Sequence, residues 1–281
     1  MALPRITDDG DAWLETARAA TLERLADGPA TVAQLRADVP ELSGTVGGTT
    51  DKPYDRPTPV APWVLTHLGL SGAALRGRNA GHWRRNLPTW TRTEDWLGDV
   101  PERLSEAAGY AELVRRWLGT FGPGTAADIQ WWLGSTKTAV TRALVDLEAE
   151  EVALDDGASG WVLPGDTADT DPVEPWAALL PTLDPTVMGW KAREVYLDPA
   201  HVRFLFDSNG NAGTTAWWDG RVVGCWVQDD AGVVRLSLLA DVPPAGRVAL
   251  DTEAERLTAW LDGTVIGNVY ASLQMKQARL P

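Results

Sequence analysis

The sequence predicts an α+β protein made of tandem winged-helix (helix-turn-helix) units, followed by a small β-barrel-like domain with a closing helix. Three observations support this fold class. The order helix, helix, helix, hairpin occurs twice within the first 170 residues. Short strand patterns joined by Asp-Gly and similar turns follow, and an amphipathic segment comes after them. We therefore expect three domains, at residues 1–109, 110–170 and 171–281.

The first unit begins with residues 11–25, whose apolar side chains recur at helical spacing. Thr31 is placed to cap a second, shorter helix. Residues 44–59 are rich in Gly, Pro and Thr and predict a loop, and residues 60–70 suit a third helix. Residues 73–93 then alternate like two strands joined by a turn, which completes the order typical of a winged helix.

The second unit repeats that order. Thr125 is placed to cap the second helix, and Ser135 or Thr136 to start the third. Residues 152–164 then resemble a short wing of strand, turn and strand. The first helix, over residues 110–121, has an apolar face that we expect to form from Leu113, Val114, Trp117 and Leu118.

The third domain follows a polar linker at residues 166–174. Short strands are predicted at residues 214–218, 221–228 and 233–239, joined by hairpin signals. An amphipathic helix at residues 251–261 closes this domain, so a curled sheet or small barrel is expected.

Charge is distributed unevenly over the chain. The formal net charge is -14, and no acidic residue occurs between Ala73 and Arg92, a segment that holds five arginines. Because exposed charges are screened beyond about 8–10 Å at physiological salt, this local excess matters more for a partner than the total does. We interpret the predicted first wing as a candidate contact with duplex DNA.

The candidate DNA-binding residues fall into two groups. Arginine forms bidentate pairs with phosphate, and a third helix meets bases and phosphates with its early polar positions. An exposed tryptophan beside the arginines, Trp83, could stack on a base. The residues are Arg76, Arg78, Arg84 and Arg85 in the first unit, and Thr136, Lys137, Thr141 and Arg142 in the second.

Each of the two groups also has an interpretation that involves no contact with DNA. The first hairpin can equally be a solvated surface with ordinary arginines. In the second unit, Asp155 and Asp156 at the wing tip would repel phosphate. A solvated helix face, in a unit that acts as a spacer, is therefore the favoured interpretation for that unit.

Other kinds of chemistry lack a signature in this sequence. It contains no nucleophile elbow, no Gly-rich nucleotide loop and no HExxH motif, and its three histidines fall in different elements. Its one cysteine, Cys225, lies in a strand pattern and is expected to be buried and inert. We expect no metal and no cofactor. With no apolar run long enough to span a membrane and no signal-peptide pattern, a cytoplasmic protein is expected.

Residues 174–228 contain a more specific pattern. LLPTLDPTVMGWK is followed by FDSNGNAG and then DGRVVGCW. These segments resemble the winged helix DNA-binding domain-containing proteins, the AlkZ-like family of bacterial DNA glycosylases. Residues 113–134 look like the middle winged helix of that family, and residues 11–42 look like the unit before it.

The resemblance implies a protein that grips duplex DNA with tandem winged helices and a β-barrel. Characterised members excise alkylated bases and use a Gln-x-Gln motif, in an N-terminal winged helix, to position the hydrolytic water. No two glutamines of this sequence have that spacing, and family members carry a further unit before the stretch that matches Asp11. We therefore expect a chain without the catalytic unit and assign no catalytic residue. A docking face left exposed in this way would favour self-association.

Five positions in this block match recurring family motifs, and their roles are open between structure and DNA contact: Asp184, Lys191, Arg193, Asn209 and Asn211. Three functional hypotheses follow. The chain is a DNA-binding protein without catalysis, an active DNA glycosylase, or a protein-interaction module. The acidic net charge favours the last, and the arginine-rich segment favours the first.

Overall fold

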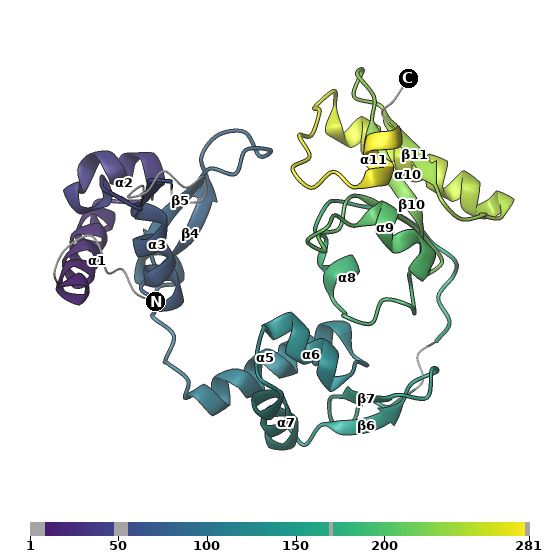
Figure 1. Ribbon diagram of the computed structural model, residues 1–281, viewed down its shortest axis with the longest axis horizontal. Coiled ribbons are helices and arrows are strands. Elements are labelled where there is room, and N and C mark those ends of the chain that lie inside the picture. The colour runs from purple at the N-terminus through teal and green to yellow at the C-terminus, as the bar shows by residue number, and fades with distance from the viewer. Residues whose placement is uncertain (1–8, 48–55, 169–170, 279–281) are drawn as a thin grey trace. The chain divides into compact units, whose positions relative to one another are not determined.

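The computed structural model describes residues 9–47, 56–168 and 171–278. The chain divides into two units, Met1–Arg103 and Leu104–Pro281, and each is described by itself (Figure 1). The residues predicted as a second and a third domain both lie in the second unit.

The first unit combines short helices with a three-stranded antiparallel sheet of order β1-β5-β4. The predicted three helices and hairpin are present, and a short strand that was not predicted, β1, pairs with the hairpin. The loop expected at residues 44–59 begins and ends in the β2–β3 pair, and residues 48–55 lie outside the described residues. The elements are α1 (Gly10–Ala26), β1 (Ala30–Thr31), α2 (Val32–Asp38), the 3-10 helix η1 (Pro40–Leu42), β2 (Thr45–Val46), β3 (Thr58–Pro59), α3 (Ala61–Leu70), β4 (Ala74–Asn79), β5 (Pro88–Arg92) and α4 (Thr93–Leu97).

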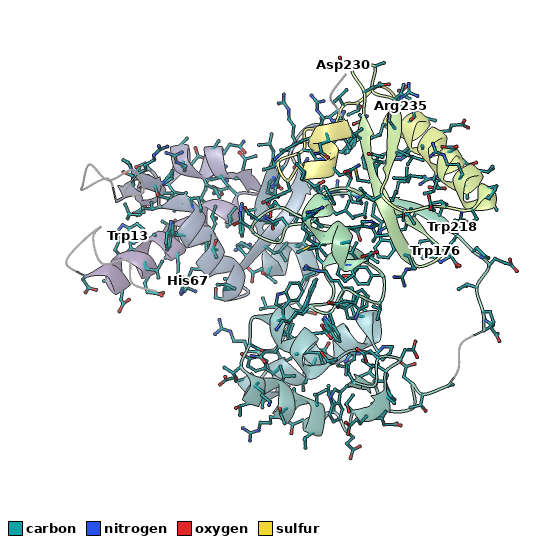
Figure 2. The ribbon with its side chains drawn as sticks, turned by 45° about the vertical axis from the view of Figure 1, so that its right-hand side comes forward. Trp13, His67, Trp176, Trp218, Asp230 and Arg235 are labelled. Atoms are coloured by element: carbon teal, nitrogen blue, oxygen red, sulfur yellow. The ribbon has the colours of Figure 1, made fainter. Side chains whose placement is uncertain are left out.

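The core of the first unit lies between the helices and the sheet. Leu25, Leu35 and Leu68 are fully buried there, and Trp90 of β5 packs against the same cluster. Figure 2 labels Trp13 of α1, which packs on this core, and His67 of α3, which is exposed. Thr31 caps α2, as the sequence predicts, and Gln34 completes a capping box with it.

The second unit starts with three helices and a two-stranded hairpin. Ser105, Thr125 and Thr136 cap the three helices through their side-chain oxygens. Leu113 is 49% exposed, so its predicted place on the buried apolar face is wrong. The buried residues of this helix are Val114 and, about one turn further on, Trp117 and Leu118. The elements are α5 (Glu106–Phe121), α6 (Ala126–Leu133), α7 (Lys137–Asp146), β6 (Glu150–Ala153) and β7 (Ser159–Val162).

An antiparallel sheet of order β11-β10-β9-β8 and the helices on its two faces form the rest of this unit. Helix α10 lies against β8, β9 and β11, while Trp217 and Cys225 on the other face join a core that includes residues of α8, α9 and α11. Figure 2 shows Asp230 and Arg235 at the turn end of β10–β11, and Trp176 and Trp218 at the opposite end of the sheet. The elements are β8 (Ala177–Leu180), α8 (Pro185–Met188), η2 (Pro199–His201), α9 (Val202–Leu205), β9 (Thr215–Trp218), β10 (Arg221–Gln228), β11 (Val234–Leu238), α10 (Pro244–Leu261) and α11 (Leu273–Ala278).

The sheet of the second unit is open rather than barrel-like. Within the described residues, no pairing joins β8 to β11. Closing a sheet into a barrel commonly takes about eight tilted strands, and four strands covered by helices on both faces bury their apolar side chains without closure. The closing helix also begins earlier than predicted, at Pro244 rather than residue 251, because proline suits the first turn of a helix.

Candidate nucleic-acid interface

The β4–β5 hairpin carries the arginines predicted to contact DNA. Its strands pair antiparallel with Arg76 opposite Trp90, and the register shifts between Arg76 and Asn79. Asn79 closes the connecting loop, because its Oδ1 accepts from the Leu87 amide at 2.7 Å and its Nδ2 donates to the His82 carbonyl at 3.2 Å. The last residue of β4 therefore holds the loop in a defined conformation.

All four predicted arginines of the hairpin are exposed: Arg76, Arg78, Arg84 and Arg85. The guanidinium carbon of Arg76 lies 5.8 Å from the centre of the Trp90 ring, a cation–π contact that positions this cation on the sheet. Among the described residues, no carboxylate lies within 4.0 Å of Arg76, Arg78 or Arg85. These cations are thus available to an anionic ligand.

Arg92, the fifth arginine of the segment, is used differently. Its Nε donates to Asp95 Oδ2 at 2.7 Å, and its Nη1 lies 3.0 Å from Glu94 Oε1. The hydrogen bond with Asp95 raises the pKa of Arg92 and lowers the pKa of the Asp95 carboxyl. The neighbouring helix α4 therefore neutralises one cation of the arginine-rich segment.

The loop of the hairpin also exposes apolar surface. The Trp83 side chain is 52% exposed and lies 5.5 Å from the His82 ring, centre to centre. Leu87 at the end of the loop is exposed as well. An aromatic ring next to Arg84 and Arg85 can stack on a base while the arginines contact phosphates.

In the second unit, the polar face of α7 is exposed. Lys137, Thr141 and Arg142 line a shallow hollow of about 530 Å³ on this helix. No carboxylate of the described chain lies within 4.0 Å of either cation. Thr136 has a structural task instead, since its Oγ1 accepts from the Ala139 amide at 3.2 Å and caps the helix.

The β6–β7 hairpin that follows α7 is acidic. Glu151, Asp155 and Asp156 are exposed on it, and Glu150 Oε1 accepts from the Gly165 amide at 2.7 Å. The side chain of Asp156 also accepts from the Ala158 amide, which fixes the turn. This hairpin would repel a phosphate backbone rather than bind it.

Asp128 is a residue of the second unit that the sequence analysis missed. Its side chain is 2% exposed, and its Oδ2 accepts from the Thr125 amide and hydroxyl at 3.0 and 2.6 Å. Its Oδ1 accepts from the amides of Lys191 and Ala192 at 2.8 and 2.9 Å. The carboxylate therefore joins α6 to the segment before β9. The spacing Thr-x-x-Asp signals the capping box, but no signal marks the two distant amides.

Hydrogen bonds within the fold involve four of the five family-motif positions, two of them through the backbone amide alone. The side chain of Asp184 caps α8 through the Thr186 amide at 2.8 Å. Asn209 and Asn211 form a turn around Asp207, whose pKa their hydrogen bonds lower, the largest contribution coming from the Asn211 side chain. Lys191 gives its backbone amide to Asp128, and Arg193 lies against aromatic rings.

Three glutamine side chains are also part of the structure. Gln34 completes the capping box of α2. Gln228 is buried and hydrogen-bonds the Gly232 and Thr264 carbonyls and the Ile266 amide. Gln274 donates to the Ser237 hydroxyl. The side-chain amides of these three glutamines are therefore occupied within the fold.

Two absences also characterise the described residues. No group of three or more His, Cys, Asp or Glu side chains is arranged to hold a metal ion in this part of the chain. None of the described helices is both long and apolar enough to cross a membrane.

Comparisons with known proteins identify one matching family and one solved structure with a similar fold. The family model described as "DNA glycosylase AlkZ-like" matches residues 5–260. Among solved structures, the DNA glycosylase AlkZ of Streptomyces sahachiroi is similar with a TM-score of 0.65 and 22% sequence identity, over 89% of this chain and 67% of that chain. At this identity the structural similarity concerns the fold. No curated protein matches the chain.

Proposed function

The chain belongs to the DNA glycosylase AlkZ-like family, and on that basis we propose that it binds duplex DNA. The observation that carries the proposal is the β4–β5 hairpin, which presents exposed arginines next to the exposed ring of Trp83. Guanidinium groups bind phosphate oxygens in bidentate pairs and also enter the minor groove. A fixed loop lowers the entropic cost of binding, because its side chains are already positioned.

In this proposal each unit contributes a winged helix. The support is the order of three helices followed by an antiparallel hairpin, which occurs in α1 to β5 and again in α5 to β7. The arginine-bearing hairpin is the DNA-binding wing of the first unit. In the second unit the polar face of α7, with Lys137, Thr141 and Arg142, faces the DNA, and the acidic hairpin lies away from it.

Fluorescence anisotropy with a labelled duplex, from about 50 to 200 mM salt, tests DNA binding. We expect affinity to fall steeply as salt rises, and to fall further in the Arg84→Ala/Arg85→Ala variant. Arg92→Ala is the matched control, because it removes an arginine that is ion-paired in the same hairpin. No binding at the lowest salt, or equal losses in both variants, would contradict the proposal.

A second candidate function is hydrolysis of the N-glycosidic bond of an alkylated base, which family membership favours. The sequence has no Gln-x-Gln pair, and three of its glutamines are used by the fold. An alkylated duplex incubated with the chain and then cleaved at abasic sites measures this activity. Release of the base supports excision, whereas binding without release supports a DNA-binding protein that does not excise.

A third candidate is a protein-interaction module, which the net charge of -14 and the acidic β6–β7 hairpin favour. Phosphate binding weakens with salt in proportion to the number of neutralised phosphates. Absence of DNA binding together with capture of a basic protein partner would therefore favour this candidate over the first.

A further inference from the structure

Arg193 differs from Asp184 and Asn211, whose side chains serve a cap and a turn, because its own side chain lies against aromatic rings. Its guanidinium carbon lies 4.4 Å from the centre of the Phe206 ring and 5.4 Å from the centre of the Trp131 ring. Trp131 belongs to α6, and Phe206 follows α9. Two rings from separate segments of the second unit therefore hold the guanidinium group.

In the part of the chain that the structure describes, the guanidinium of Arg193 is not paired with a carboxylate, in contrast to several other arginines of the second unit. Arg235 and Arg256 pair with carboxylates at 2.9 and 2.8 Å, whereas Arg193 has no carboxylate within 4.0 Å among the described residues. Its Nε is buried without a partner. Burial raises the pKa of the Tyr196 hydroxyl, and the nearby Arg193 guanidinium opposes that rise. The two terminal nitrogens of Arg193 are not sealed in the way that its Nε is.

The loop that carries Arg193 is attached to α6 and to the end of α5. The amides of Lys191 and Ala192 donate to the buried Asp128, and the Trp190 indole donates to the Phe121 carbonyl at 3.0 Å. The Arg193 carbonyl accepts from the Leu197 amide at 2.8 Å, which fixes the chain beyond it. Backbone and side chain are thus both positioned before any ligand binds, which lowers the entropic cost of binding.

We propose that Arg193 binds a backbone phosphate of duplex DNA, end-on through its two terminal nitrogens. The proposal rests on the DNA-binding function proposed above and assigns a phosphate contact in the second unit outside α7. Because the Nε is sealed, a side-on bidentate pair is blocked, whereas the end-on pair stays open. Stacked guanidinium groups are suited to phosphate binding, since they are less strongly hydrated than ammonium groups. The exposed Lys191 adds a second cation two residues away.

The test is the salt dependence of duplex binding by the full chain, measured for wild type and three variants. Arg193→Met keeps an apolar stem against the two rings and removes the charge. Arg193→Lys keeps the charge and removes the fork. Arg235→Met is the matched control, because it removes an exposed, ion-paired arginine of the same unit. Thermal unfolding of each variant reports whether it folds.

We expect the slope of log affinity against log salt to decrease in magnitude by about 0.9 in Arg193→Met, the change for one lost phosphate contact with B-DNA. Arg193→Lys should keep the wild-type slope and bind a few-fold more weakly. Arg235→Met should match wild type in both measures.

A wild-type slope and affinity in Arg193→Met would overturn this inference while leaving the proposed function intact. A folded Arg193→Lys variant with the reduced slope of the methionine variant would also overturn it, because the effect would then come from packing. Absence of duplex binding by the wild-type chain would overturn both proposals.

Discussion

The two units begin alike and end with hairpins of opposite charge. In both, three helices precede an antiparallel hairpin, and a capping box starts the second helix, at Thr31 in one unit and Thr125 in the other. The β4–β5 hairpin exposes arginines, whereas the β6–β7 hairpin exposes aspartate and glutamate. The order of elements therefore predicts the local fold, while the side chains at the hairpin decide which ligand it can bind.

The second unit is also the more acidic of the two by net charge. Residues 1–103 hold 12 basic and 14 acidic residues, a net charge of -2, and residues 104–281 hold 13 and 25, a net charge of -12. Together these give the total of -14. The acidic character of the chain thus comes from the second unit and says little about the arginine-bearing hairpin of the first.

The largest expected difference between the two units is in the stability that their capping boxes contribute. Asp128→Ala removes an acceptor of four hydrogen bonds, two of them from Lys191 and Ala192, so we expect a loss of about 3 kcal/mol in the free energy of unfolding. Gln34→Ala removes an exposed capping partner and should cost about 1 kcal/mol. Urea unfolding followed by circular dichroism measures both. Equal losses would show that the two distant amides add no stability.

Charge reversal of the first hairpin is expected to have the next largest effect. Arg84→Glu/Arg85→Glu should weaken duplex binding about thirtyfold, if each lost phosphate contact contributes about 1 kcal/mol. Anisotropy titration at fixed salt measures the change. Arg247→Glu/Arg256→Glu on α10, the same change of charge in the other unit, serves as a control, and a similar loss there would mean that total charge controls binding.

The single cysteine of the chain lies in the second unit, and its buried thiol makes the stability of that unit depend on pH. Burial raises the pKa of the Cys225 thiol to about 12 from an ordinary value of 9.0. The folded chain therefore keeps its proton in a pH range where the unfolded chain loses it, and the free energy of unfolding falls by about 1.4 kcal/mol per pH unit from pH 9 upwards.

Reaction of Cys225 with an aromatic disulfide reports this state. At pH 8 we expect no reaction in the folded chain and complete reaction in urea. Rapid labelling of the native chain would contradict the burial of this thiol. In Gln34→Ala, whose change lies in the other unit, the labelling midpoint in urea should stay at the wild-type value.

Neutralising the acidic hairpin should have the smallest effect. Asp155→Asn/Asp156→Asn keeps the side-chain oxygen that accepts from the Ala158 amide and removes two negative charges. We expect duplex affinity to rise about twofold at low salt and to be unchanged at high salt, because such surface charges act through screened interactions. Anisotropy at the two salt concentrations checks this, and a loss of affinity would place the hairpin in contact with DNA.

Local patterns predicted much of the fold. Thr31 and Thr125 were placed as caps from single residues, and Thr136 was one of two candidates beside Ser135; each of the three threonines caps its helix. Hairpin signals located β9, β10 and β11 to within a residue or two. The apolar run of β8 was missed, because a short buried run does not distinguish strand from helix and its partner lies far along the chain.

The candidate site was harder to predict, because it depends on contacts between distant segments. The sequence identified the arginine-rich segment, but it did not show that Asp95 and Glu94 neutralise Arg92. It also gave no indication that Arg193 would lie between Trp131 and Phe206. Such contacts follow from tertiary packing, for which residue spacing carries no signal.

The hydrogen bonds between Asp128 and the amides of Lys191 and Ala192 can form only after the ribosome has made the later segment. The partners are separated by 63 and 64 residues. At about 5–20 residues per second, a ribosome takes roughly 3–13 seconds to add that length of chain. During this interval α6 exists without the partners of its carboxylate. The capping box of the first unit, in which Gln34 is three residues from Thr31, has no comparable wait.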